Sequence, residues 1–181
     1  KAARMIAKSG AKPKRTILFI GFAGEEFGLL GAQAWVKAHK DKLPKIANLF
    51  NRDGGPEPPV GISVPQAMYD DFVKISEPIQ KIRPDYPFEV KVREPRKRPT
   101  RMGGTDASVF AIEGVPTLGF TTEDFKGYDF DYGEIWHTER DLYTKNIPEY
   151  QEHTATVTAI IALGVANLDK QLSREGLYTE E

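Results

Sequence analysis

The feature that most constrains this chain is an apolar run that ends in two adjacent glutamates. The run, Ile-Leu-Phe-Ile-Gly-Phe-Ala, spans residues 17–23 and is followed by Gly24, Glu25 and Glu26. Such a run is typical of a strand buried on both faces, as in a parallel sheet. In open α/β sheets, ligands bind at the carboxyl ends of the strands. We therefore predict a functional site here, where one carboxylate binds a cation and the other moves a proton.

The composition excludes several classes of protein and of site. With 25 basic and 26 acidic residues, the net charge of −1 does not indicate a nucleic-acid or membrane-surface partner. No run approaches the ~20 apolar residues of a membrane span, and no signal peptide is evident. Cysteine is absent, which excludes disulfides and thiolate metal sites. Only His, Asp and Glu remain as plausible metal ligands.

Strand and helix patterns alternate along the whole chain, which suits one domain, 1–181. After the first strand, further strands are predicted at 46–50, 88–92 and 115–120. Helices are predicted at 1–9, 29–39, 66–82, 106–113 and 146–168. The alternation favours an α/β fold, a three-layer α/β/α sandwich with a mostly parallel mixed sheet. Because the chain opens inside a helical pattern without an initiating Met, we expect a truncated domain whose N-terminal strands are missing.

The candidate site residues share a position in the predicted fold, because each follows a strand. Glu25 and Glu26 follow the first strand, Asp53 the second and His137 the last, and Asp106 opens the helix after the third. Strand ends that converge on one sheet edge would gather these side chains from distant parts of the sequence. Oxygen and nitrogen ligands without a thiol suit a catalytic zinc ion, or a pair of them.

Four ordered motifs extend this interpretation. They are Gly-Glu-Glu-Phe-Gly-Leu-Leu-Gly at 24–31, Asn-Arg-Asp-Gly-Gly at 51–55, Gly-Thr-Asp at 104–106 and Trp-His-Thr-Glu-Arg-Asp at 136–141. In order and spacing they resemble the motifs of the zinc exopeptidases of metallopeptidase family 28. That family holds aminopeptidases, glutamate carboxypeptidases, a plasma carboxypeptidase/dipeptidase branch and the related glutaminyl cyclases. The context of Gly103–Asp106 and Gly114–Pro116 is similar to the plasma carboxypeptidase branch.

The resemblance implies a role for each candidate residue. Glu25 would be the general base that takes a proton from the attacking water, and the substrate would be a peptide. Glu26 and His137 would bind one zinc ion and Asp53 the other. The family pattern also has a histidine and a metal-bridging aspartate upstream of this chain's first residue. We therefore expect two zinc ions in the full-length parent, whereas this chain alone should bind zinc poorly and be inactive.

A second departure from the family pattern lies next to the histidine. Trp136 stands where many family aminopeptidases have a tyrosine that stabilises the oxyanion. An indole N–H can also donate a hydrogen bond, but with a different reach. Because Trp-His also occurs in the cyclase branch, a glutaminyl cyclase-like acyltransferase remains an alternative. The chain's other histidines, His39 and His153, lie in helical patterns and match no family ligand.

Each assignment also has a structural alternative. Glu25 and Glu26 could be a helix-start pair favoured by the helix dipole, and Asp53 a turn residue before two glycines. His137 could be a structural histidine. Asp106 is either a helix cap or a residue that orients a metal ligand at the edge of the site. Trp136 either packs in the core or lines the site.

Two loops leave their roles open. The basic loop holds Arg93, Arg96, Lys97, Arg98 and Arg101. We expect these charges to be solvated surface, and the alternative is that one arginine grips a carboxylate of the substrate. The aromatic loop holds Phe125, Tyr128, Phe130 and Tyr132, which either shape a side-chain pocket or pack over the sheet edge.

Two classes of function compete at this point. One is a metal-dependent hydrolase that acts at a peptide terminus, and the other is a non-catalytic scaffold or binding domain with the same fold. The presence of a general base together with metal ligands favours the enzyme. The family resemblance also implies a secreted or periplasmic protein. Missing strands would leave an unpaired sheet edge, through which we expect self-association.

Overall fold

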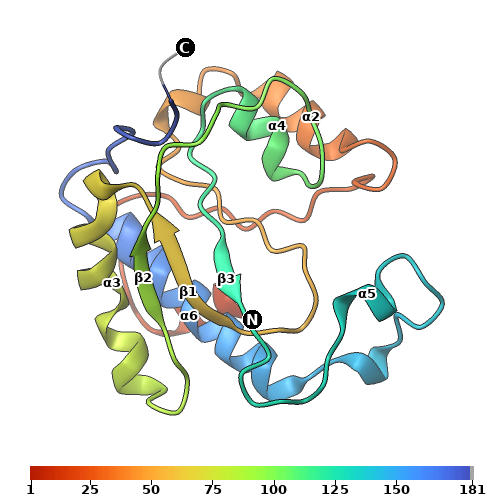
Figure 1. The fold of residues 1–181 in the computed structure, drawn as a ribbon. Helices are drawn as coiled ribbons and strands as arrows, with labels where there is room; N and C mark the ends of the chain where they lie inside the picture. The colour runs from red at the N-terminus through yellow and green to blue at the C-terminus, as the bar shows by residue number, and fades with distance from the viewer. Residues whose placement is uncertain (180–181) are drawn as a thin grey trace.

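The computed structural model describes residues 1–179, which form a mixed α/β fold (Figure 1). In chain order the elements are α1 (Ala2–Lys8), α2 (Leu30–Ala38), η1 (Leu43–Lys45), β1 (Pro59–Val64), η2 (Gln66–Met68), α3 (Tyr69–Ile82), β2 (Glu89–Val92), α4 (Ala107–Ile112), β3 (Phe120–Thr122), α5 (Tyr132–Ile135), η3 (Tyr143–Lys145) and α6 (Pro148–Asn167). All five predicted helices are present, as α1, α2, α3, α4 and α6. Among the described residues, no helix combines the length and the apolar character needed to cross a membrane.

The three strands form one mixed sheet in the order β2-β1-β3. β1 runs parallel to β2, with Ile62 opposite Val90, and antiparallel to β3, with Ile62 opposite Phe120. β1 and β2 approach closely at Gly61, where an added Cβ would lie 2.4 Å from the Glu89 carbonyl oxygen. The predicted α/β class is confirmed, and the sheet is mixed, with one parallel and one antiparallel pair.

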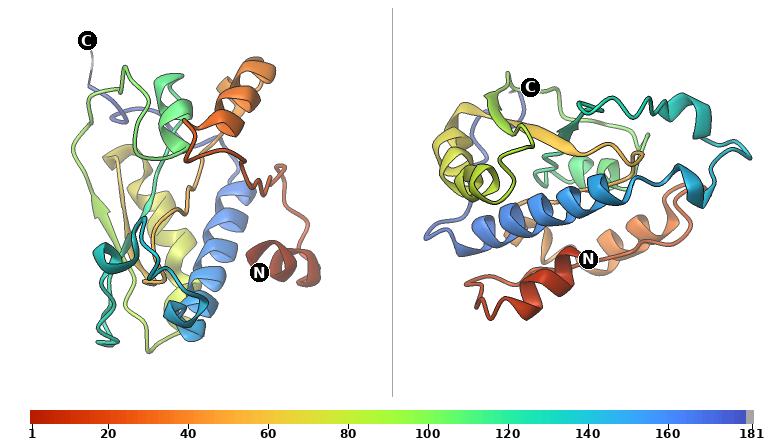
Figure 2. Two further views of the ribbon diagram at one scale, coloured as in Figure 1. Left: turned by 90° about the vertical axis from the view of Figure 1, so that its right-hand side faces the viewer. Right: turned by 90° about the horizontal axis from the view of Figure 1, so that it is seen from below.

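Helices cover one face of this sheet. α3 and α6 pack on each other behind the strands in Figure 1, and α1 lies on the outer side of α6 in Figure 2. α2 and α4 pack together beyond the ends of the strands. Among residues 1–179, no helix lies over the sheet face that points toward the viewer in Figure 1. The described part of the chain therefore shows the sheet and the helices of one face.

The main core lies between the sheet and the α3–α6 pair. It contains Ile62, Val64, Met68, Phe72, Ile75, Ile79, Leu118, Val157, Ile161, Val165, Leu172 and Leu177. Phe72, Ile75 and Ile79 recur at three- and four-residue spacing on α3, so that one face of the helix is buried. A second cluster around α2 and α4, which includes Val36 and Phe110, supports the part of the chain that carries the two glutamates.

The prediction of a buried strand at 17–23 is wrong for this structure. These residues form no strand, and the side chains of Leu18, Phe19 and Ile20 are 63%, 49% and 45% exposed. A strand buried on both faces needs neighbours that satisfy its backbone groups. Within residues 1–179, the segment 16–22 makes no backbone hydrogen bond to another extended segment. Within the described residues, the apolar run therefore joins no sheet.

The predicted strands at 46–50 and 115–120 also differ from the structure. The two segments run side by side, joined by a hydrogen bond from the Leu49 N–H to the Pro116 carbonyl of 2.9 Å. At the next position the Leu118 N–H donates to Oδ1 of the Asn48 side chain at 2.9 Å, and not to a backbone carbonyl of the neighbouring segment. A side-chain amide in the ladder position prevents a regular ladder, and a true strand, β3, begins only at Phe120.

Gly164 marks the closest contact between α6 and α3, and it allows a stability prediction. Gly-to-Ala in a helix normally stabilises by about 1 kcal/mol. Here an added Cβ would lie 2.4 Å from Cγ2 of Ile75, a stiff β-branched side chain that is 8% exposed. We therefore expect Gly164→Ala to destabilise the chain by about 1–3 kcal/mol in urea unfolding. In a double-mutant cycle, Ile75→Ala should relieve part of this cost, and strictly additive effects would contradict the predicted overlap.

Candidate active site

A tight turn presents Glu25 and Glu26 ahead of α2. Gly24 and Gly28 flank the pair with φ of 68° and 102°, values that glycine adopts without steric cost. The N–H groups of Gly28 and Leu29 donate to the Glu25 carbonyl at 3.0 and 2.8 Å. Because α2 begins at Leu30, neither glutamate belongs to its first turn, so the helix-dipole alternative does not explain the pair.

The structure brings Glu26 and His137 together from positions far apart in the sequence. Oε2 of Glu26 lies 3.1 Å from Nε2 of His137, and both side chains are more than half exposed, at 63% and 56%. The His137 backbone has a φ of 56°, in the left-handed region that side chains other than glycine seldom adopt. An exposed pair of a carboxylate oxygen and an imidazole nitrogen is a contact that a cation can bridge.

Asp53 and Asp106 lie on two loops that are tied to each other. Nδ2 of Asn51 donates to Oγ1 of Thr105 at 2.8 Å, which joins the loop before Asp53 to the loop before Asp106. Asp106 is only 8% exposed, and its Oδ1 has no hydrogen-bond partner. It occupies the N-cap position of α4 but makes no side-chain cap bond, since Thr105 Oγ1 accepts from the Ala107 N–H instead. The capping alternative for Asp106 therefore lacks its hydrogen bond.

The electrostatics show that the carboxylates share one region. Partial burial raises the pKa of Glu25, and the negative charges of Asp53, Glu26 and Asp106 raise it further, while His137 acts in the opposite direction. Burial, followed by the charge of Asp53, also raises the pKa of Asp106. Like charges this close favour protonation or a bound cation.

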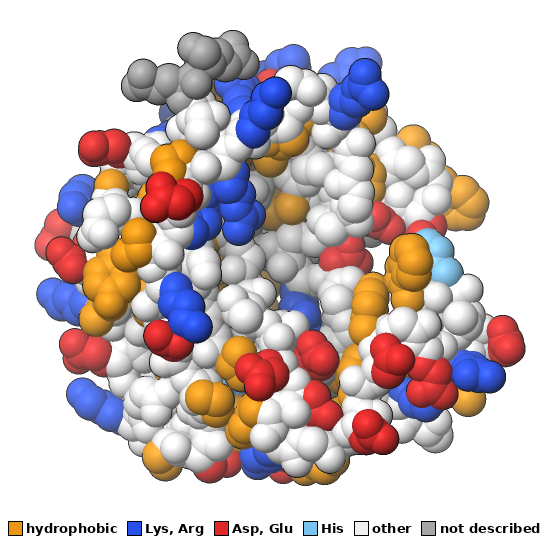
Figure 3. Space-filling model, viewed as in Figure 1, with side chains coloured by type: hydrophobic (Ala, Val, Ile, Leu, Met, Phe, Trp, Pro, Cys, Tyr) orange, Lys and Arg blue, Asp and Glu red, His pale blue; other side chains and the backbone are white. Residues whose placement is uncertain are grey.

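A large cavity opens over these residues. It has a volume of about 1350 Å³, and its lining includes Glu25, Glu26, Asp53, Trp136 and His137. In the space-filling view, acidic side chains and a histidine lie next to hydrophobic ones on the right side of the hollowed face (Figure 3). Trp136 is 59% exposed and its ring lies 4.8 Å from that of His137, so it lines the site and does not pack in the core.

The aromatic loop packs in two directions. Phe130 and Tyr132 cover Gly55, where an added Cβ would lie 2.7 Å from Cε1 of Phe130 and 3.0 Å from Cδ2 of Tyr132. Phe125 instead packs on Tyr86 in the body of the domain, with ring centroids 4.9 Å apart. The first contact couples the Asp53 loop to the start of α5, two elements whose association no sequence pattern indicates.

The chain also matches known proteins in sequence. Residues 1–161 match the sequence model described as Peptidase family M28. The chain belongs to this family. Carboxypeptidase Q of Mus musculus is 24% identical over 178 residues, which are 96% of this chain and 34% of that protein. A probable zinc metalloprotease of Pyrenophora tritici-repentis is 50% identical over 42 residues, which are 23% of this chain and 10% of that protein.

A solved M28 structure supports the fold assignment. The Peptidase M28 precursor from Shewanella amazonensis SB2B superposes with a TM-score of 0.72 at 26% identity, covering 95% of this chain and 36% of that one. The chain thus spans about a third of the length of carboxypeptidase Q and of this solved M28 protein.

The basic loop does not line the cavity. Arg93 donates to the Leu177 carbonyl at 3.4 Å and Arg98 to the Ile112 carbonyl at 2.9 Å, so these guanidinium groups hold backbone segments together. None of the five basic side chains at 93–101 lines the 1350 Å³ cavity. This placement argues against a substrate grip. Four of the five side chains are exposed as expected, whereas Arg93 is half-buried.

The donor set fits part of a zinc site. Two ligands of one tetrahedral zinc, with bonds of ~2.0–2.2 Å, lie roughly 3.4 Å apart. The Glu26 oxygen and the His137 nitrogen are 3.1 Å apart, close to that separation. Within residues 1–179, however, no three His, Asp or Glu side chains are placed to hold one ion together. Catalytic zinc usually has three protein ligands, so the described residues supply an incomplete set.

Proposed function

We propose that the whole M28 protein containing this chain hydrolyses a terminal peptide bond with the help of zinc. The observation that carries this proposal is the 3.1 Å contact between Glu26 and His137 at the wall of a large cavity, with Glu25 beside it. In this proposal Glu26 and His137 bind one zinc ion, and Asp53 binds a second. The family membership supports a peptidase, and the zinc metalloprotease name of one relative supports the metal.

The residues of this chain divide the chemistry among them. A bound zinc ion supplies Lewis-acid polarisation of the scissile carbonyl and makes a nearby water more acidic. Glu25 accepts the proton of the attacking water and delivers it to the leaving amine as the bond breaks. The indole N–H of Trp136, at the cavity wall, is a donor available to the oxygen that becomes negative. The Asn51–Thr105 hydrogen bond ties the Asp53 loop to the loop that carries the buried Asp106.

Substrate sets with blocked termini test the reaction class. The whole protein should cleave a dipeptide series with free termini, and it should stop when the terminus that it recognises is acetylated or amidated. Metal analysis of the same samples should show zinc, and a chelator should abolish turnover. Cyclisation of N-terminal glutaminyl peptides without hydrolysis would favour the cyclase alternative. The absence of both reactions in a zinc-loaded sample would favour a non-catalytic binding domain.

The 181-residue chain by itself should not be a peptidase. Glu26 and His137 provide two ligands for one ion and Asp53 a single ligand for the other, and the neighbouring carboxylates raise the pKa of Glu25. We therefore expect calorimetric titration with zinc to show no pair of tight sites, and no release of product from an aminoacyl substrate. Two tight sites per chain together with hydrolysis would refute this expectation.

A further inference from the structure

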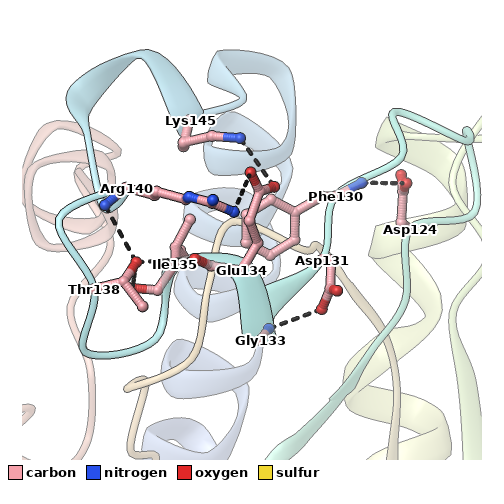
Figure 4. A network of polar contacts seen from close by, with 9 residues as sticks. All are labelled: Asp124, Phe130, Asp131, Gly133, Glu134, Ile135, Thr138, Arg140 and Lys145. Atoms are coloured by element: carbon pink, nitrogen blue, oxygen red, sulfur yellow. Dashed lines mark hydrogen bonds and ion pairs between the residues drawn. The ribbon is translucent and has the colours of Figure 1, made fainter.

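We propose that Glu134 is a positioning residue whose carboxylate clamps the loop that presents His137. Its Oε2 lies 3.0 Å from Nζ of Lys145, and its Oε1 lies 3.8 Å from Nη1 of Arg140. Figure 4 shows Arg140 and Lys145 both directed at this one carboxylate. The inference rests on the proposed ligand role of His137 and adds the contacts that hold this ligand in place.

The loop at 136–144 needs such contacts because it has no buried side chain of its own. Ile135 is 7% exposed and is the last buried residue before the loop. Every residue from 136 to 144 is exposed, up to 90% at Tyr143. Segments with few buried apolar contacts open locally at low free-energy cost. Polar contacts must therefore define the path of the chain around His137.

The backbone of His137 adds a second reason. Its φ of 56° lies in the left-handed region, which costs a residue other than glycine of order 1 kcal/mol or more. Such a conformation persists only when the surrounding structure holds it. A loop released from its contacts would relax this residue and swing the imidazole away from Glu26.

Glu134 contacts the loop on both sides of His137. Its backbone carbonyl accepts a hydrogen bond from Oγ1 of Thr138 at 2.9 Å, and the Thr138 N–H donates to the Ile135 carbonyl at 3.1 Å. Its side chain then reaches Lys145, which leads into the anchored helix α6. The entry and the exit of the loop are thus joined through one residue, with His137 between them.

Loss of the Glu134 ion pairs should affect the loop and not the stability of the whole domain. Partly exposed ion pairs contribute only ~0–1 kcal/mol to global stability, and the Glu134 and Lys145 side chains are both 37% exposed. Loss of the clamp should therefore leave the domain folded and increase the opening of the loop. Substitution of residues that orient metal ligands typically weakens metal binding 10–100-fold. We expect a loss of about tenfold here, because Glu134 holds the loop and does not contact the His137 ring.

Hydrogen exchange of the 181-residue chain tests the clamp without reference to metal or activity. Glu134→Gln should speed exchange of the Thr138 and Lys145 amides about tenfold while leaving the amides of α3 unchanged. Glu139→Gln removes the same charge from an exposed position in the same loop and should change neither. Glu134→Asp, which keeps the charge, should restore part of the protection. Equal loop exchange in Glu134→Gln and the native chain would overturn the clamp.

Zinc competition titration of the whole protein tests the positioning role. Glu134→Gln should weaken zinc binding about tenfold, Glu134→Asp less, and Glu139→Gln not at all. Faster loop exchange with unchanged zinc affinity, in a protein whose His137→Ala variant loses zinc, would overturn positioning. If His137→Ala itself retains zinc, the proposed function fails at that ligand, while the exchange experiment still decides whether the clamp exists.

Discussion

Replacing Glu25 with Gln should lower the kcat of the whole protein by at least ~10²-fold while its zinc content stays unchanged. Glutamine keeps the shape of the side chain but cannot accept the proton of the attacking water. Glu25 lies in the cavity wall next to Glu26, which contacts His137, so a proton acceptor at this position faces the proposed metal. Steady-state hydrolysis of a dipeptide, beside zinc analysis of the same sample, measures both quantities.

The neighbouring substitution separates the two glutamates. Glu26→Gln should lose zinc, because an amide oxygen is a much weaker ligand than a carboxylate, and its activity should fall with metal occupancy. Excess zinc should then recover part of the Glu26→Gln activity and none of the Glu25→Gln activity. Glu139→Gln, prepared in parallel, controls for the loss of a surface carboxylate. If Glu25→Gln loses the metal and Glu26→Gln keeps it, the two roles have been exchanged.

Helices were predictable from the sequence because their information is local. In α3, the apolar residues repeat with the helical period over 14 residues, and the structure buries that face. In α4, Gly114 follows the last turn with a φ of 77°, a conformation that suits glycine at a helix end. Each of these signals lies within the element itself, so no knowledge of the remaining fold is needed to interpret it.

Strands were predicted less well because their stability depends on partners elsewhere in the chain. The run at 17–23 has the composition of a central strand, yet it finds no ladder among the described residues and leaves Leu18 exposed. The opposite error concerns β1, for which no strand was predicted. Its sequence, Pro-Val-Gly-Ile-Ser-Val, carries a proline and a glycine that normally weaken a strand. Gly61 is instead needed for the close approach to β2.

The candidate site shows the same division. Its acidic residues and His137 were proposed from their positions after predicted strands and from the motif resemblance, and the structure brings Glu26 and His137 into contact. The contacts that hold the site's loops in place were not predicted from the sequence. Gly55 under Phe130, and Glu134 between Arg140 and Lys145, depend on how loops meet in space. No periodicity or spacing encodes such contacts.

Lowering the pH should destabilise the chain through His153, a buried residue of α6 that does not line the cavity. The side chain is fully buried, its Nε2 donates to the Pro59 carbonyl at 3.0 Å, and its Nδ1 has no partner. The ring stacks on Tyr86 at 3.9 Å, while Arg83 and Lys126 lie over the Tyr86 ring at 4.4 and 4.6 Å. Protonation would place a third cation in this stack.

Burial lowers the pKa of His153 to about 4, and the charges of Arg83 and Lys126 act in the same direction. The Pro59 carbonyl and the charge of Asp85 oppose this shift. The unfolded chain has an ordinary histidine pKa of about 6.5, so between these values it binds a proton that the folded chain does not. Stability from this residue is therefore complete above pH 6.5 and is lost as the pH falls toward 4. The loss should reach roughly 2 kcal/mol at pH 5 and about 3 kcal/mol at pH 4.

Urea unfolding of the 181-residue chain between pH 7.5 and pH 4 measures this loss, with His153→Phe as the comparison. Phenylalanine retains the stack on Tyr86 but cannot take up a proton, and it leaves the Pro59 carbonyl without its donor, so the variant should be less stable at pH 7. The stability difference between the two proteins should shrink by roughly 2–3 kcal/mol on acidification, because only the native chain has an imidazole to protonate. His39→Phe controls for the loss of an imidazole as such and should keep the decline seen in the native chain. A gap between the native chain and His153→Phe that stays constant from pH 7.5 to pH 4 would show that His153 is not held in its neutral form by the fold.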